Sequence, residues 1–435
     1  MMKFKADSII KRCFNAIFYG IGGAVGSRLL MVLTNIVLSR ILGEEYYGQY
    51  SFVNNTVNLF VTFSGLGLTT TLVRYIAANK QNKILQGIYI RTLSVYCGAF
   101  SIAFSASLYA FSDIVSQYSC GNDTLSCYFK IVSIAILFSS LANVEQGIMI
   151  GFEQFKISSL LQIIRCGIYF IASWILTKKF GIIGAMYGIV ITYGCLLFLS
   201  LLLNHRYYTI NNIKLKFVVN EETNYTLINF SLPAFISSIY VLPINWVCNA
   251  ILTNYSGFTQ MAYFSIAQQW MTYITYIPSQ LGQLRPIYTD LIVNKQFLKL
   301  KKIVNKTTLI TTGLAFLAAV GISIFSEEVL LVYGNTYIES RYAFITMLFV
   351  AVLYTAQVQT GFIIQAAGRM WLGVLINAIW GISLVLCFTV LKKHMALGYA
   401  ISYLVSYAII VIFQYCIYKK IINREDSGIL CKKSC

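Results

Sequence analysis

The chain has 435 residues, of which 58% are hydrophobic and only 11% are charged, whereas a soluble domain carries about 25% charged residues. This composition excludes a soluble globular enzyme. The 33 Lys and Arg outnumber the 15 Asp and Glu and give a net charge of +18. In so apolar a chain we expect this charge at the edges of membrane spans, not on a nucleic-acid-binding surface.

Twelve membrane-spanning helices are predicted from the hydropathy of the chain. A window of about 19 residues finds stretches long enough to cross about 30 Å of hydrocarbon. In chain order these are 18–40, 50–72, 88–111, 130–150, 157–177, 181–203, 228–252, 258–283, 306–325, 342–365, 371–391 and 395–418. The predicted organisation is therefore an N-terminal six-helix bundle 1–203, a connecting loop 204–227, a C-terminal six-helix bundle 228–418 and a basic tail 419–435.

The distribution of basic residues predicts the orientation. The first apolar run is too long for a signal-peptide core and no small-residue cleavage site follows it, so we expect the first span to be retained. Most Lys and Arg fall on the side of the predicted membrane that holds both termini and the 204–227 loop. Because cytoplasmic loops are enriched in basic residues, we predict an all-α integral membrane protein with cytoplasmic N- and C-termini.

The predicted connections between spans are too short to hold a catalytic domain, which needs at least about 50 residues. The sequence contains no Walker A, H-E-x-x-H or G-x-S-x-G pattern. With only two histidines, His205 and His394, and no paired C-x-x-C, we expect no metal site. The prediction is a protein that is not an enzyme, has no cofactor and works through its spans.

An internal repeat relates the two halves of the chain. A constant shift of 214 residues places Val144–Ile150 on Val358–Ile364 and Gly167 on Gly381 without gaps. Six spans per half is an even number, so both halves enter the membrane from the same side as parallel repeats. Such repeats are typical of transporters with a substrate site between the halves and alternating access by rocking.

Two arginines, Arg28 and Arg165, fall inside predicted spans, where an ionised Arg costs about 2.5 to 3.5 kcal/mol. One interpretation is a substrate-binding, cationic cavity in which the guanidinium groups hold phosphate oxygens in a bidentate manner. The other is an intramembrane salt bridge or a side chain that reaches the interface.

Three further charged residues are candidates for function. Glu145 lies in the fourth predicted span, where it either couples transport to protons or forms a salt bridge with Arg165. Arg74 and Arg91 flank the predicted inner loop between spans 2 and 3. They either contact a substrate headgroup at the cytoplasmic mouth or serve as ordinary positive-inside anchors.

Prolines and cysteines add two structural hypotheses. Pro233 and Pro243 fall in span 7, where they form either a hinge or a static kink. Cys120 and Cys127 share an outward loop and are candidates for a disulfide if that side is oxidising. The 31 Tyr and 29 Phe either form interfacial belts or line a cavity and stack on sugars, and the sequence leaves this open.

Four short motifs carry a family resemblance, namely Leu42–Tyr50, Gly65–Leu68 leading to Arg74–Ala77, Lys179–Ala185 and Tyr333–Tyr337. With them the chain resembles the bacterial polysaccharide-transport family of the MOP exporter superfamily, which includes the O-antigen (Wzx-type) flippases. The resemblance implies a V-shaped, MATE/MOP-like pair of six-helix bundles in the bacterial cytoplasmic (inner) membrane. It also implies a role in polysaccharide and lipopolysaccharide biosynthesis.

The implied function is translocation of an undecaprenyl-pyrophosphate-linked oligosaccharide, an O-antigen or similar repeat unit, from the inner to the outer leaflet. Basic residues on span 1 are among those implicated in the family, and Arg28 matches that role. Implied partners are this lipid-linked substrate, membrane lipids, a polysaccharide polymerase and a chain-length regulator, with no nucleic acid. An H⁺ or Na⁺ gradient or the membrane potential is the candidate driving force.

Two other functions are alternatives to the flippase. A MATE-like drug or cation exporter should carry carboxylates within its lobes, whereas Glu145 is the single acid inside the predicted spans. A membrane polymerase or glycosyltransferase would need a catalytic segment that the predicted loop lengths do not provide. The flippase is therefore the preferred prediction.

Overall fold

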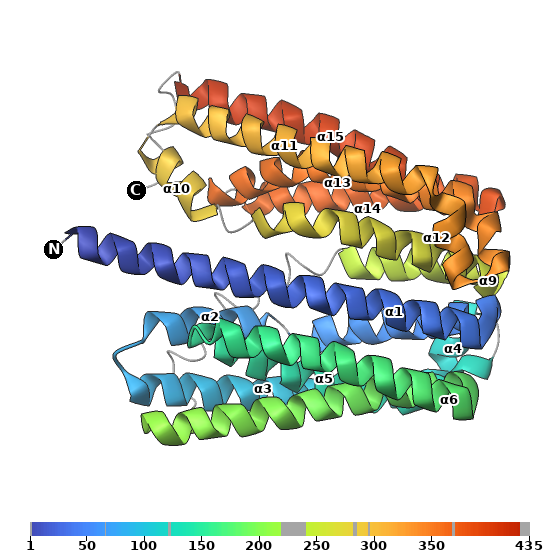
Figure 1. Ribbon diagram of the computed structural model, residues 1–435, viewed down its shortest axis with the longest axis horizontal. Helices are drawn as coiled ribbons and strands as arrows, with labels where there is room; N and C mark the ends of the chain where they lie inside the picture. Colours follow the sequence, from blue (N-terminus) through green and yellow to red (C-terminus); the bar gives the residue numbers. More distant parts are fainter. Residues whose placement is uncertain are drawn as a thin grey trace. The chain divides into compact units, whose positions relative to one another are not determined.

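The computed structural model describes residues 2–65, 67–120, 123–218, 241–281, 285–294, 296–367 and 370–426. Every regular element in these ranges is a helix (Figure 1). The long and short α-helices are α1 Met2–Gly65, α2 Leu68–Ala78, α3 Lys83–Ala110, α4 Ser112–Cys120, α5 Ser126–Gly151, α6 Phe155–Asn211, α9 Val241–Gln280, α10 Arg285–Val293, α11 Phe297–Ile324, α12 Ser326–Tyr333, α13 Arg341–Ala366, α14 Met370–Leu391 and α15 Met395–Asp426, with single 3-10 turns η1 Asp123–Leu125, η4 Asn335–Ser340 and η5 Lys392–His394.

The chain forms two compact units, Met1–Ile239 and Tyr240–Cys435. The first unit contains α1 to α6 and the second contains α9 to α15. Helix α6 continues past the predicted end of a span at 203 and reaches Asn211, within the predicted connecting loop 204–227. The polar residues that follow position 203 are compatible with a continued helix. The helix ends where Asn212 adopts a left-handed conformation with φ 54°.

Seven ranges of the described residues are long and apolar enough to cross a membrane. Three of them, Val25–Gly65, Phe155–Asn211 and Trp371–Lys419, have 41, 57 and 49 residues. At 1.5 Å per residue each would measure about 60 Å or more, twice the hydrocarbon thickness of about 30 Å. Each is interrupted by one residue of positive φ, at Gly43, Gly181 and Met395.

The interruptions confirm the predicted internal repeat. Gly43 and Gly257 lie 214 residues apart and share nearly the same backbone, with φ 71° and ψ 176° against φ 82° and ψ 175°. Gly181 and Met395 have the same spacing, with φ 58° and ψ −139° against φ 55° and ψ −134°. Helices α3 and α11 also begin and end at this offset. The two units therefore share one plan of helices and turns.

The short helices α4 and α12 repeat the same plan of charges. Each begins with a fully buried serine followed by an acid, and the acid pairs with a cation near the start of the next long helix: Asp113 with Lys130, and Glu327 with Arg341. The Ser126 hydroxyl and then the Lys130 ammonium hold the pKa of the Asp113 carboxyl below its ordinary 3.8. The contribution of the Asp113 contacts to folding stability is therefore fully present above pH 3.8, the ordinary pKa. It is lost as the pH falls through the lowered pKa of the folded protein.

The turn at Met395 predicts a measurable strain. A side chain at φ 55°, ψ −134° is unfavourable for an L-residue, and such strain costs about 1 to 3 kcal/mol. We expect Met395→Gly to raise the midpoint of thermal unfolding in detergent and Gly181→Ala, at the equivalent turn, to lower it. Gly167→Ala is the matched control, because Gly167 is helical and an added Cβ meets nothing within 4 Å. A lower midpoint for Met395→Gly would contradict this account.

The second predicted span ends earlier than expected. Helix α1 stops at Gly65, and α2 begins at Leu68 after Gly67, which has a left-handed φ of 69°. A continuous helix over 50–72 is therefore wrong, since the glycine pair breaks the backbone. Helix α2 then packs on α5, where a Cβ added to Gly147 would lie 2.7 Å from Thr69 Cγ2.

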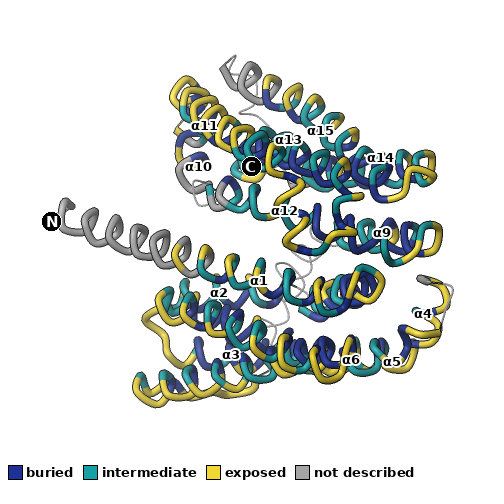
Figure 2. The backbone as a smooth tube through the Cα atoms, turned by 45° about the vertical axis from the view of Figure 1, so that its right-hand side comes forward, coloured by how far each residue is buried: buried dark blue, intermediate teal, exposed yellow. Residues whose placement is uncertain are grey.

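Large apolar side chains cover the outer faces of the helices. Leu309, Leu317 and Ile412 are 76%, 68% and 67% exposed, and exposed positions recur along α6 and α11 (Figure 2). A water-soluble monomer rarely exposes such continuous apolar surface, whereas lipid tails accept it. The polar side chains that carry chemistry are therefore expected between the helices of each unit.

Candidate functional site

Arg28 and Arg165 lie at the same level of the first unit. The first segments of α1 and α6 run in the same direction (Figure 1), and a Cβ added to Gly26 would lie 3.5 Å from Ile163 Cδ1. Each arginine follows that contact by two residues and is half-buried. At 1.5 Å per residue, they lie about 22 and 24 Å from the turns at Gly43 and Gly181.

Neutral amides hold the Arg165 side chain. Its Nε donates to Gln162 Oε1 at 3.2 Å, and Gln162 Nε2 donates to Gln146 Oε1 on α5 at 2.7 Å. A further contact joins Arg165 Nη2 and Cys166 Sγ at 3.6 Å. Within the described ranges no carboxylate pairs with Arg165. Its positive charge is therefore positioned but not neutralised.

Glu145 has a different partner from the one that the sequence suggested. Its buried carboxylate Oε2 accepts from Asn204 Nδ2 at 2.6 Å, and the same amide donates to the Glu145 main-chain oxygen at 3.0 Å. The salt bridge with Arg165 is therefore wrong, because Glu145 packs against the second segment of α6 whereas Arg165 lies on the first. The equivalent Gln359 accepts from the Tyr288 hydroxyl at 2.8 Å.

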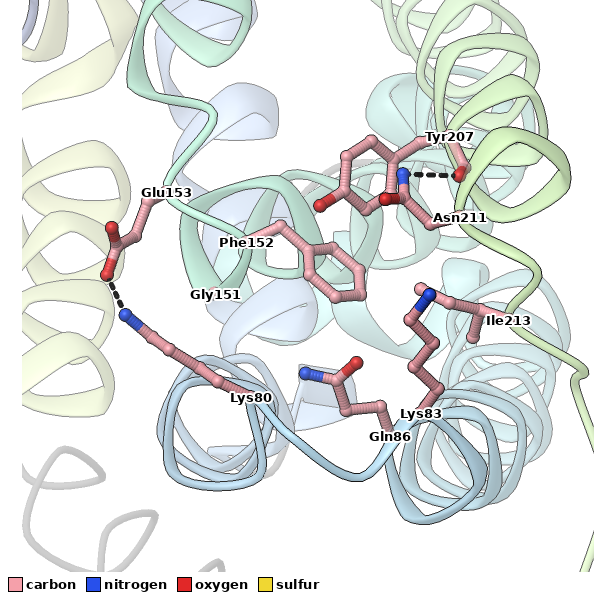
Figure 3. Close-up of a pocket in the computed structure, with 9 residues that line it drawn as sticks. All are labelled: Lys80, Lys83, Gln86, Gly151, Phe152, Glu153, Tyr207, Asn211 and Ile213. Atoms are coloured by element: carbon pink, nitrogen blue, oxygen red, sulfur yellow. Dashed lines mark hydrogen bonds and ion pairs between the residues drawn. The ribbon is translucent and has the colours of Figure 1, made fainter.

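A cavity of about 250 Å³ lies where the start of α3 meets the ends of α5 and α6 (Figure 3). An ion pair between Lys80 and Glu153 closes one side, and the Phe152 and Tyr207 rings lie 4.7 Å apart over it. It is lined by Lys80, Lys83, Gln86, Gly151, Phe152, Glu153, Tyr207, Asn211 and Ile213.

Arg74 and Arg91, the predicted mouth residues, are exposed on α2 and α3 and are not part of this lining. Lys80 and Lys83 line the cavity instead, and because Lys80 is paired with Glu153, the net positive charge of the described lining comes from Lys83. Sequence reasoning missed them because lysines beside a predicted span cannot be told from positive-inside anchors.

The second unit holds a cavity of about 300 Å³, and none of the described residues that line it is charged. Amide and aromatic side chains from α13, α14 and α15 surround it. The lining residues are Val241, Tyr354, Gln357, Val358, Gly361, Phe362, Gln365, Ile376, Asn377, Trp380, Tyr407, Ile410 and Gln414. The sequence signal for this cavity was the repeat: shifted by 214, Ile376 and Trp380 fall on Gln162 and Cys166, beside Arg165.

The remaining predicted residues are a pair of prolines and a pair of cysteines. Pro233 lies outside the described residues, and Pro243 is the third residue of α9, so the hinge stays a prediction. The disulfide is not formed, because Cys127 is a free and exposed thiol in the first turn of α5. The side chain of its predicted partner Cys120 lies outside the described ones.

Two solved structures define the fold. An inward-facing multidrug resistance MATE family transporter of the MOP superfamily aligns with a TM-score of 0.79 at 14% identity, over 93% of this chain and 96% of that one. The lipid II flippase MurJ aligns with a TM-score of 0.75 at 15% identity, over 94% of this chain and 90% of that one. The fold is therefore that of a MOP-superfamily transporter.

The sequence identifies the family within that class. Residues 14–290 match the polysaccharide biosynthesis protein family, and the chain belongs to it. A protein assigned as an O-antigen transporter in Shigella flexneri is 25% identical over 91% of this chain and 94% of its own length. EpsE of Ralstonia solanacearum, an EPS I polysaccharide export inner membrane protein, is 22% identical over 61% of this chain and 60% of its own.

These findings confirm the resemblance to the polysaccharide-transport branch of the MOP superfamily. With seven apolar ranges that can span a bilayer, the chain is a multi-pass inner membrane protein.

Proposed function

We propose that the chain is a flippase that moves an undecaprenyl-pyrophosphate-linked oligosaccharide from the inner to the outer leaflet by alternating access. The observation that carries this proposal is the pair Arg28 and Arg165 at one level of the first unit, with Arg165 held by amides and paired with no carboxylate among the described residues. The family and the O-antigen and EPS relatives support the substrate class.

A pyrophosphate fits this arrangement chemically. Its oxygens accept from planar guanidinium forks, and such charge-assisted hydrogen bonds are about twice as strong as neutral ones. The substrate would supply the negative charge that the amides around Arg165 do not. This binding step makes and breaks no covalent bond and so requires no catalytic group, in keeping with the proposal of a transporter and not an enzyme.

The proposed topology has twelve spans, with both termini cytoplasmic. Dividing the long helices at Gly43, Gly181 and Gly257 gives each unit six long segments. The lipid-linked substrate and membrane lipids are the proposed partners, together with a polymerase and a chain-length regulator. An ion gradient or the membrane potential is the proposed driving force.

Two native cysteines test this orientation. Cys127 lies in the first turn of α5 at the proposed outer end, Cys416 lies near the inner end of the predicted span 395–418, and both are exposed. In intact cells, a variant that keeps only Cys127 should react with an impermeant maleimide, whereas one that keeps only Cys416 should react after the membrane is opened. The reverse pattern would overturn the orientation.

Transport itself is tested in liposomes. The purified chain is reconstituted with a fluorescent undecaprenyl-pyrophosphate oligosaccharide, and the fraction of label open to an external quencher is followed over time. We expect crossing to exceed that of protein-free liposomes and of liposomes with an unrelated membrane protein. Equal rates in all three preparations would overturn the proposed function.

A MATE-like exporter is the second candidate, favoured by the likeness to a MATE transporter. The small number of acids argues against it, since Glu145 is the single acid inside the predicted spans. The same liposomes loaded with a cationic dye separate the two: gradient-driven dye movement without crossing of the lipid would favour the exporter.

A further inference from the structure

We propose that the cavity of the second unit, whose lining residues are given above, binds uncharged sugar residues of the transported oligosaccharide. This inference rests on the proposed flippase function and adds a second recognition site to it. The ligand class is a neutral, polyhydroxylated ring, in contrast to the anion proposed for Arg28 and Arg165.

Two buried polar atoms in this cavity lack a partner within the part of the chain that the structure describes. Trp380 is 4% exposed and its Nε1 donates to no described residue, and Gln414 is 5% exposed and its Oε1 accepts from no described residue. Buried donors and acceptors are almost always paired in folded proteins. Since both side chains line the cavity, a bound molecule that offers one acceptor and one donor would satisfy them.

A sugar hydroxyl group is both a donor and an acceptor, so adjacent hydroxyls on one ring match an indole N–H and an amide oxygen. Further amides on the same wall come from Gln357 and Asn377, and each offers two donors and one acceptor oxygen. A charged ligand would find no counter-charge among the described residues of this lining, and burying an unpaired charge is costly. The lining therefore selects a polar but neutral molecule.

The aromatic rings of the cavity supply the apolar part of the match. Trp380 lies 5.7 Å from Tyr407, and Tyr354 lies 5.7 Å from Tyr407, measured between ring centroids. The Trp380 and Tyr407 rings are tilted by 51° and the Tyr354 and Tyr407 rings by 79°, so each ring is held in place by its neighbour and offers its apolar face without further ordering cost. The C–H face of a pyranose packs on such a surface while its hydroxyls reach the amides.

The repeat shows how the two units have diverged at this position. Val241 and Trp380 correspond to Ser27 and Cys166, the neighbours of Arg28 and Arg165 in the sequence of the first unit. The same place in the duplicated plan therefore carries cations in one unit and amides with aromatic rings in the other. A substrate that joins a pyrophosphate to sugars contains one chemical part for each.

Binding in detergent tests this assignment with separated parts of the substrate. The probes are the phosphate-free oligosaccharide released from the cells' own surface polysaccharide, and inorganic pyrophosphate. We expect Trp380→Phe and Gln414→Met each to weaken oligosaccharide binding by about tenfold, as for loss of a buried hydrogen bond, and to leave pyrophosphate binding unchanged. Arg28→Ala should show the opposite pattern.

Trp371→Phe is the matched control, because Trp371 lies on the same helix α14 but is 81% exposed. Wild-type affinity for the oligosaccharide in both Trp380→Phe and Gln414→Met, or no binding by the wild type, would overturn the sugar site. Thermal unfolding of each variant separates lost binding from lost folding. If Trp380→Phe is unstable, Gln414→Met still tests the site, because methionine preserves the length of the side chain.

The binding experiment and the liposome assay can fail independently of one another. Lipid crossing by the wild type without oligosaccharide binding would overturn the sugar site and leave the flippase standing. Selective loss of oligosaccharide binding in the two variants, without any lipid crossing by the wild type, would support the site and contradict the flippase.

Discussion

Replacing Arg28 with Ala is expected to slow the crossing of the lipid-linked oligosaccharide by about 10- to 100-fold, the effect of removing a hydrogen bond to a charged group. The half-buried side chain lies in the first segment of α1, level with Arg165. Arg28→Lys should restore only part of the rate, since an ammonium keeps the charge but loses the bidentate fork. The measurement is the quencher-accessible fluorescence in liposomes.

The control for charge is Arg206→Ala, which removes an exposed arginine from the end of α6 and should leave the rate unchanged. If both arginines bind one anion, Arg165→Ala should slow the crossing rate as Arg28→Ala does. The double variant should then slow the rate by less than the product of the two single effects. A fully inserted Arg28→Ala protein that flips at the wild-type rate would remove the anion-binding role.

Replacing Glu145 with Gln is expected to abolish the response of transport to an imposed pH gradient while leaving downhill crossing intact. A carboxylate can exchange a proton, whereas an amide cannot. Glutamine still accepts from Asn204, as Gln359 accepts from Tyr288 in the second unit. Folding should therefore be preserved, whereas Glu145→Ala removes the acceptor and should lower stability by about 1 kcal/mol.

Glu328→Gln is the control for the acid-to-amide change, because Glu328 is exposed in the first turn of α12. The rates with and without the gradient are compared in the same liposome preparation. Acceleration of Glu145→Gln by the pH gradient to the wild-type extent would exclude this carboxyl as the coupling group. A Na⁺ gradient or the membrane potential would then be tested as the driving force.

Local properties of the sequence determined the helical membrane class, the duplication and the candidate arginines. Hydropathy and helix length depend on neighbouring residues, and the 214-residue shift already paired Gly167 with Gly381 before the turns at Gly43 and Gly257 confirmed it. An arginine within an apolar run can be identified from the sequence for the same reason, because only the neighbouring residues are needed. The motifs around the turns carried the family resemblance, which the match over residues 14–290 confirmed.

Only the tertiary structure decided the partners of the buried polar groups. Glu145 bonds to Asn204 and not to Arg165, and the cavity beside α2 and α3 is lined by lysines and not by Arg74 or Arg91. Which face of one helix meets which face of another depends on packing between residues far apart in the chain. The unpaired atoms of Trp380 and Gln414 became apparent for that reason only when their helices were placed side by side.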